Sequence, residues 1–148
     1  MKTKPQQPEE TTFTLITQVS DLWQESVDQE LKKNGLTANE FNILTSLVWL
    51  KNESTHVTQV NICEYINVKP MNTSIIMRKL QTKKLIQRKE HPIDTRAKTI
   101  SLTPVGEKKI AEVVQAVDTL TVKFFNIEPN KIAEFNKRIL EIRNNKKK

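Results

Sequence analysis

Apolar residues recur every three or four positions along most of the chain, the spacing of one face of an α-helix. The first stripe covers 13–31 and is closed by Gly35, a residue suited to the left-handed position after a helix. A second helix is expected from 37 to about 50. There Thr37 and Glu40 have the spacing of a capping box, in which each side chain accepts the other residue's backbone N–H.

The period of the pattern changes in the middle of the chain. Thr58 is placed to cap a short helix, and Pro70 suits the first position of the next one, where no N–H is needed. Alternating residues then predict two strands, which form a ribbon that is marginal unless it packs on helices. The expected elements are helices over 58–66 and 70–84, strands over 85–90 and 98–102, and a loop over 91–97.

Two more helices are expected in the last third of the chain. Thr103-Pro104 begins one of about 20 residues, or about 30 Å, which is longer than the small central core can cover. Pro129 begins the last helix, and 144–148 is expected to be a frayed basic tail. The first, fifth and last helices therefore carry apolar stripes without a partner in the same chain. A homodimer formed by these helices is favoured over a monomeric bundle.

A short helix, a tight break, a second helix and a basic ribbon together predict a helix-turn-helix followed by a wing. The fold class is accordingly mainly α with a small two-stranded β-wing. We expect one continuous structural domain in which 36–103 form the winged helix-turn-helix core. Residues 11–35 and 104–145 would form the dimerisation helices, and the polar residues 1–10 would be disordered.

Composition excludes several classes of protein. The chain has two glycines, 71 positions apart, so neither a dinucleotide fingerprint nor a phosphate-binding loop is present. No apolar run is long enough to span a membrane, and the start does not resemble a signal peptide. The lone Cys63 can form no internal disulfide, which fits a reducing cytoplasm, and a buried structural role is favoured over redox sensing. His56 and His91 are isolated in the sequence, so neither a metal nor a cofactor is expected.

Positive charge is concentrated in one segment. Residues 69–109 hold 11 Lys and Arg against 3 Asp and Glu, a net charge of +8, whereas the rest of the chain carries −1. Such a field attracts a polyanion, although a solvated basic face is the alternative interpretation.

The motifs of 57–110 match those of a known family in order and spacing. They are Thr58-Gln59, Val68-Lys69-Pro70, Lys83-Lys84-Leu85-Ile86, Asp94-Thr95-Arg96 and Ser101-Leu102-Thr103-Pro104-Val105-Gly106. With these motifs the chain resembles the MarR (multiple antibiotic resistance regulator) family of winged helix-turn-helix transcription regulators. The resemblance implies a homodimeric repressor on pseudo-palindromic double-stranded DNA, released by a small-molecule effector, a metal or an oxidant.

The helix over 70–84 would then enter the major groove. With one face turned to the core, its outward residues would be Asn72, Ser74, Ile75, Arg78 and Lys79, and Lys69 would stand beside the phosphate path. Many family members have Arg where this chain has Ile75. Isoleucine cannot hydrogen-bond a base but can touch a thymine methyl, which suggests T-rich operators.

The wing would reach the minor groove. Asp94 and Arg96 are two residues apart, which would put both side chains on one side of a ribbon, so that Asp94 orients the Arg96 guanidinium. Arg88, Lys89 and Lys98 would attract phosphates. Thr95 replaces a frequent second Arg. Lys84 stands where the family often has Gly, and a slightly different turn is favoured there over a strained lysine.

Two other functions remain open at this point. An enzyme is disfavoured because the chain has no nucleophile elbow, metal pair or phosphate loop. A winged-helix module that binds only proteins is the other alternative, and Ile75 and Thr95 are the residues that suggest it. The family also implies a ligand crevice beside the dimer helices. Phe13, Trp23, Phe41 and Trp49 are apolar enough to line one, although a plain core position is favoured for each, and the ligand-binding residues stay unassigned.

Overall fold

The structure, a computed structural model, describes residue 7 and residues 11–146. Its elements in chain order are α1 (Thr12–Lys33), α2 (Ala38–Glu53), α3 (Gln59–Ile66), α4 (Pro70–Thr82), β1 (Ile86–Glu90), β2 (Lys98–Leu102), α5 (Pro104–Phe125), the 3-10 turn η2 (Pro129–Lys131) and α6 (Ile132–Asn145). The mainly α fold with one antiparallel two-stranded sheet is thus confirmed. Apart from residue 7, the segment 1–10 that was expected to be disordered lies outside the described residues, as do 147 and 148.

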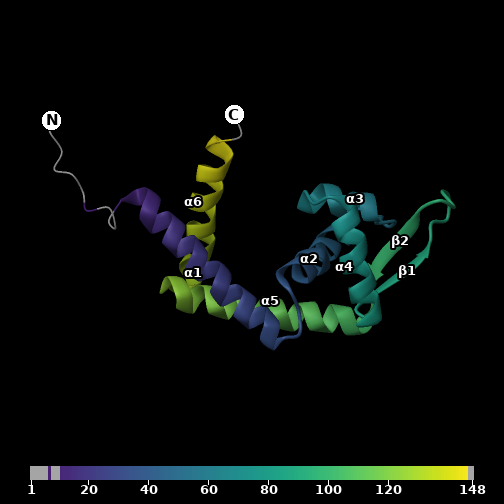
Figure 1. The fold of residues 1–148 in the computed structure, drawn as a ribbon, viewed down its shortest axis with the longest axis horizontal. Helices are drawn as coiled ribbons and strands as arrows, with labels where there is room; N and C mark the ends of the chain where they lie inside the picture. Colours follow the sequence, from purple (N-terminus) through teal and green to yellow (C-terminus); the bar gives the residue numbers. More distant parts are fainter. Residues whose placement is uncertain (1–6, 8–10, 147–148) are drawn as a thin grey trace.

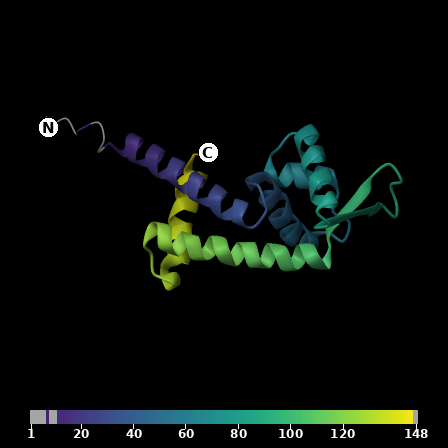
Figure 2. The same cartoon turned by 60° about the horizontal axis from the view of Figure 1, so that its bottom comes forward.

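The elements gather at two ends of an elongated molecule. Helices α2, α3 and α4 and the two strands form one end, which we call the winged head, and the strands project from it (Figure 1). Helix α5 runs from the base of the strands to the other end, where it meets α1 and α6 (Figure 2). We call α1, α6 and the second half of α5 the helical arm.

Polar caps explain where the helices begin. The Thr37 hydroxyl accepts the Glu40 N–H at 3.2 Å while the Glu40 carboxylate accepts the Thr37 N–H at 2.9 Å, so the predicted capping box is confirmed. Thr58 caps α3 with the same reciprocal bonds, to Asn61, whereas at the start of α5 the Thr103 hydroxyl accepts the Gly106 N–H without a return bond. Gly35, with φ of 73°, takes the predicted left-handed position after α1.

One apolar core holds the winged head together and reaches the near part of the arm. Leu31 of α1 and Val113 of α5 are fully buried against it, so both long helices are anchored at their head-side ends. The largest fully buried apolar side chains are Leu31, Ile43, Leu44, Leu47, Ile62, Met77, Leu80, Ile86 and Val113. In the described part of the chain, no helix combines the length and the apolar character that a membrane span requires.

A cluster of rings joins the three helices of the arm. Trp23 of α1 packs on Phe124 and Phe125 of α5, each at 5.2 Å between ring centroids, and Phe125 packs on Phe135 of α6 at 5.0 Å. Phe13 and Trp49 are exposed instead, so a plain core position is wrong for these two aromatic residues. The far part of the arm is therefore held by a few aromatic contacts rather than by the main core.

Some element ends differ from the sequence prediction. Helix α2 continues to Glu53, and α4 stops at Thr82, two residues before the predicted end. Pro129 begins a 3-10 turn in which the Lys131 N–H bonds the Glu128 carbonyl at 2.8 Å, and the α-helix itself starts only at Ile132. Residues 144 and 145, predicted to be a frayed tail, belong to α6.

The prediction of a slightly different turn at Lys84 is wrong. Its φ is 59°, the left-handed conformation that favours glycine, so the turn keeps the geometry for which many family members use Gly. The Lys84 N–H bonds the Gln81 carbonyl at 2.9 Å and the Leu85 N–H bonds the Leu80 carbonyl at 3.0 Å. These two bonds close the end of α4 and fix where β1 starts, which requires the strained conformation whatever the residue is.

Replacing Lys84 with glycine should therefore stabilise the protein. Relief of the left-handed strain is worth about 1–2 kcal/mol, and the extra chain entropy of glycine in the unfolded state offsets about half of it. We expect the free energy of unfolding in urea to rise by about 0.5–1 kcal/mol in Lys84→Gly. Lys84→Ala removes the same charge but keeps the strain, so it should change stability little. Equal stabilisation by both variants would contradict the strain at this residue.

Candidate nucleic-acid interface

Helices α3 and α4 form the predicted helix-turn-helix. Asn67 ends α3 with φ of 53°, and Pro70 starts α4 three residues later. The Gln59 side-chain amide donates to the Pro70 carbonyl at 3.0 Å, which ties the start of α3 to the start of α4. Lys69 occupies the cap position of α4 without a side-chain capping bond, and its side chain is exposed.

The two faces of α4 are clearly separated. Thr73, Met77 and Leu80 are buried in the core of the head. Of the five residues predicted to face outward, Asn72, Ile75, Arg78 and Lys79 are exposed and Ser74 is half-buried. The outward face also includes Met71, whose side chain is 76 % exposed and which the sequence interpretation missed. Its position four residues before Ile75 is the signal that could have identified it.

The base of the wing is fixed to the helices. Strands β1 and β2 pair from Ile86 opposite Leu102 to Glu90 opposite Lys98. The Ile100 N–H also bonds the Val57 carbonyl at 2.7 Å, and Thr58 bridges Thr99, so the residues before α3 extend the ribbon beside the middle of β2. The wing therefore has a defined direction relative to α3 and α4.

Asp94 and Arg96 meet at the tip of the wing, as predicted, but not for the predicted reason. Both lie in the turn between the strands, where strand alternation does not apply. The Asp94 carboxylate accepts the Arg96 backbone N–H at 3.1 Å and lies 3.5 Å from the Arg96 Nε. The Arg96 side chain is 93 % exposed, so the turn projects a guanidinium into solvent beside a carboxylate that orients it.

His91 organises the same turn. Its Nδ1 accepts the N–H groups of Ile93 and Asp94 at 3.2 and 3.1 Å, an arrangement that assigns the proton of the neutral ring to Nε2. The ring lies 5.2 Å, between centroids, from that of His56 in the α2–α3 loop. The two histidines that are isolated in the sequence are thus neighbours in space, and His91 holds the backbone that presents Arg96.

Arg88 differs from the exposed basic side chains around it. It lies on β1 opposite Ile100 and is half-buried, and its Nε and one terminal nitrogen, Nη2, are buried without a hydrogen-bond partner among the described residues. Together with Arg96 and Lys98 it lines a cavity of about 330 Å³ beside the start of α3. Within the described residues, Lys69, Arg78, Lys79 and Lys98 are exposed and have no carboxylate within 4.0 Å. Their charge is therefore free to act on a partner.

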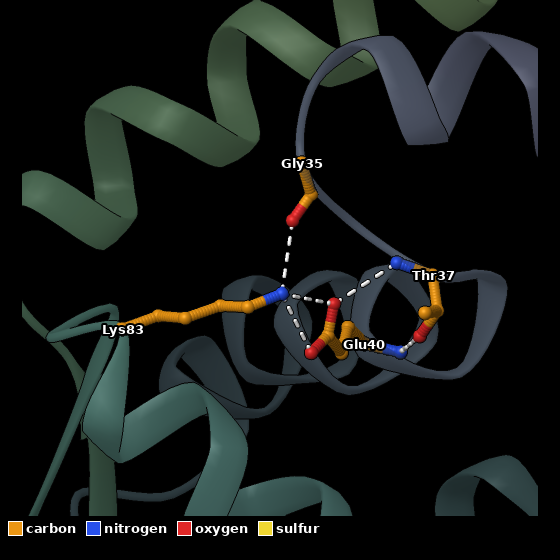
Figure 3. A network of polar contacts seen from close by, with 4 residues as sticks. All are labelled: Gly35, Thr37, Glu40 and Lys83. Atoms are coloured by element: carbon orange, nitrogen blue, oxygen red, sulfur yellow. Dashed lines mark hydrogen bonds and ion pairs between the residues drawn. The ribbon is translucent and has the colours of Figure 1, made fainter.

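An ion pair between a partly exposed lysine and a buried carboxylate connects the end of α4 with the α1–α2 link (Figure 3). The Lys83 ammonium lies 2.8 Å from both carboxylate oxygens of Glu40 and 2.9 Å from the Gly35 carbonyl oxygen. The Glu40 side chain is 3 % exposed and the Lys83 side chain 40 %. The Lys83 ammonium thereby joins the end of α4 to the link between α1 and α2.

Comparisons with known proteins agree with this geometry. The family model described as ArnR1-like, winged-helix domain matches residues 37–120. The chain is similar to the uncharacterised HTH-type transcriptional regulator YdcH of Bacillus subtilis (strain 168), with 30 % identity over 111 residues that cover 75 % of this chain and 76 % of that protein.

Two solved structures show the same fold over nearly the whole chain. Wild-type E. coli MarR in its apo form aligns with a TM-score of 0.69 and 19 % identity, covering 89 % of this chain and 96 % of that one. The S. aureus MepR–DNA complex aligns with a TM-score of 0.71 and 21 % identity, covering 94 % and 99 %. The matched winged-helix model and the related regulator show that this chain belongs to the ArnR1-like winged-helix family of HTH-type transcriptional regulators, and it has the fold of the MarR-family structures that its sequence resembles.

Proposed function

We propose that the protein is a homodimeric repressor that binds a pseudo-palindromic operator. Helix α4 would enter the major groove and the Arg96 turn the adjacent minor groove, and two such heads would read half-sites about 34–36 Å apart. The observation that carries the proposal is the set of exposed cations without acidic partners, among the described residues, on α4 and the wing. The similar fold of MepR, a protein solved in complex with DNA, supports it.

The proposal assigns a role to each predicted site residue. Asn72, Ser74 and Ile75 would face base edges, and Asp94 would orient Arg96 in the minor groove. Lys69, Arg78, Lys79, Arg88 and Lys98 would supply attraction to phosphates that is independent of sequence. Arg88 would act from the inner side of the wing, where its buried nitrogens lack an acceptor in the described part of the chain.

Dimerisation is proposed from the exposed apolar side chains of the arm. These side chains lie on α1 and α6, in the ranges 11–35 and 104–145 that we assign to dimerisation. Several large apolar side chains exposed on one helix are typical of an interaction site. The exposed residues are Phe13, Leu15, Ile16, Val19 and Leu22 on α1 and Ile139, Leu140 and Ile142 on α6.

We further propose that a small effector can release the DNA. The support is a groove of about 670 Å³ that lies between α3 and the start of α4 and includes Val60, the buried Cys63, Val68 and Pro70 in its lining. A ligand seated there would displace the start of the helix that reads the DNA. As a member of a regulator family, the chain is assigned regulation and not catalysis.

Fluorescence anisotropy with the protein's own promoter DNA tests the operator proposal. The association constant for the promoter should exceed that for a scrambled duplex of equal length by at least about 10³-fold. A plot of the logarithm of this constant against the logarithm of the salt concentration should have a slope of about −0.9 per phosphate contact. Equal affinity for both duplexes would refute operator reading and favour the protein-binding alternative.

Analytical ultracentrifugation of the free protein should show a dimer, and a monomer at micromolar concentration would refute the assigned arm interface.

The wing arginine gives a sharper prediction. Arg96→Ala should weaken operator binding by about 10- to 100-fold, the value of one well-placed arginine contact, and leave the dimer intact. Arg143→Ala removes the same charge from α6 in the arm and should change operator affinity far less. Unchanged operator affinity in Arg96→Ala would show that the wing does not contact DNA.

A further inference from the structure

Two large apolar side chains stand on the solvent-facing side of α4. Met71 is 76 % exposed and Ile75 52 % exposed. They are four residues apart, so they lie only about 40° from each other around the helix. Apolar side chains exposed at this spacing form a continuous ridge along one line of the helix, which we call the apolar ridge.

The ridge occupies the centre of the outward face. Met71 and Ile75 flank the buried Thr73 by two positions each, which turns both by about 160° away from it. Asn72 and Lys79 lie to one side of this line and Ser74 to the other. The ridge is therefore what a surface directly facing α4 would meet first.

The charged residues around the ridge indicate which kind of partner surface would face α4. Within the described residues, Arg78 and Lys79 on α4 and Lys69 at its N-cap are exposed cations near the ridge and have no carboxylate within 4.0 Å. An apolar partner helix or a groove of another protein would leave these cations unpaired, whereas a polyanion matches them. Duplex DNA presents phosphates at the edges of its major groove and, on the groove floor, one apolar group, the C5-methyl of thymine.

We propose that Met71 and Ile75 recognise thymine methyl groups in the operator, an inference that rests on the proposed entry of α4 into the major groove. The ridge extends about 6 Å along the helix, close to two base-pair steps of about 3.4 Å. It therefore fits thymines at nearby positions of one half-site. Isoleucine cannot hydrogen-bond a base and the methionine sulfur is only a weak acceptor, so the methyl group is the feature by which they distinguish thymine from cytosine or uracil.

Substitution of thymine by deoxyuridine removes this methyl group and leaves the hydrogen-bonding pattern of the base unchanged. Duplexes selected by the protein from random DNA would be resynthesised with deoxyuridine at single thymine positions. Loss of one buried methyl should weaken binding about fourfold, and loss of two about 10- to 20-fold. The sensitive positions should repeat symmetrically in both half-sites.

Protein variants identify the side chains responsible. In the double variant Met71→Ala/Ile75→Ala, the thymine and deoxyuridine duplexes should bind with equal affinity, because the partner of the methyl is gone. Val105→Ala trims a similarly exposed apolar side chain at the start of α5 and should keep the full deoxyuridine effect. Circular dichroism would verify that each variant is folded.

The outcomes separate this inference from the operator proposal. Specific binding without deoxyuridine sensitivity, or with sensitivity that persists in the double variant, would overturn methyl recognition and leave operator reading intact. Selection that enriches no sequence would overturn both. Enrichment of sites in which thymine is absent opposite α4 would likewise overturn the role of the ridge.

Discussion

The Gly106→Ala variant is expected to lose about 2 kcal/mol of unfolding free energy. A Cβ at this position would lie 2.0 Å from the Leu85 carbonyl oxygen and 2.9 Å from its carbon, and both are backbone atoms that cannot rotate away. Helix α5 would have to move outward, which would strain the bond from the Thr103 N–H to the Leu85 carbonyl at 3.0 Å. Overpacking of this severity lies at the upper end of the usual cost of about 1–3 kcal/mol, although alanine returns up to about 1 kcal/mol of helix propensity.

Urea unfolding measures this loss. With a slope of about 1–3 kcal/mol per molar, a loss of about 2 kcal/mol should lower the midpoint by roughly 0.7–2 M. Val105→Ala changes the adjacent, exposed residue of the same helix and should move the midpoint little. If the two variants unfolded at the same urea concentration, the close approach of α5 to the start of β1 would be refuted.

Lys83→Met is expected to cost about 2 kcal/mol. In this variant the Glu40 carboxylate, which is 3 % exposed, keeps the Thr37 N–H as its one hydrogen-bond donor among the described residues. Removing one partner of a fully buried pair costs about 3–5 kcal/mol, and the 40 % exposure of Lys83 lowers this figure. Because the lost bonds join α4 to the α1–α2 link, operator affinity should fall as well.

A second change isolates the buried charge as the cause. In Glu40→Gln/Lys83→Met the amide oxygen still accepts the Thr37 N–H, and no charge remains without a partner, so most of the lost stability should return. As a control, Lys51→Met breaks the half-exposed Lys51–Glu107 pair and should cost under about 1 kcal/mol. A double variant no more stable than Lys83→Met would contradict this account.

The sequence was most informative where structure depends on neighbouring residues. Thr37, Thr58 and Thr103 start helices because their hydroxyls reach a backbone N–H three residues on, and Gly35 ends one because it tolerates a positive φ. The alternation of apolar and polar residues likewise predicted the strands of the wing. The basic segment identified the head because its exposed lysines and arginines are close together in the chain.

Contacts between residues that are far apart in the sequence could not be predicted in this way. The pairing of Glu40 with Lys83 joins positions 43 apart, and the contact of His56 with His91 depends on how the wing folds back on the α2–α3 loop. Lys84 shows a different limit, because the two bonds that close α4 outweigh the preference of lysine for negative φ. Strand alternation also failed for Asp94 and Arg96, since a turn sets their geometry.

The attachment of the wing has a consequence for the entropy of binding. Its base is tied by the bond from the Thr103 N–H to the Leu85 carbonyl and its middle by the bond from the Ile100 N–H to the Val57 carbonyl, whereas its tip is a short turn organised by His91 and Asp94. Immobilising a long side chain such as that of Arg96 on DNA costs about 0.5–1.5 kcal/mol, and ordering a free loop would add to this. Because folding has already ordered the base of the wing, that entropy loss is confined to the tip, which keeps the freedom to adapt to minor grooves of different width.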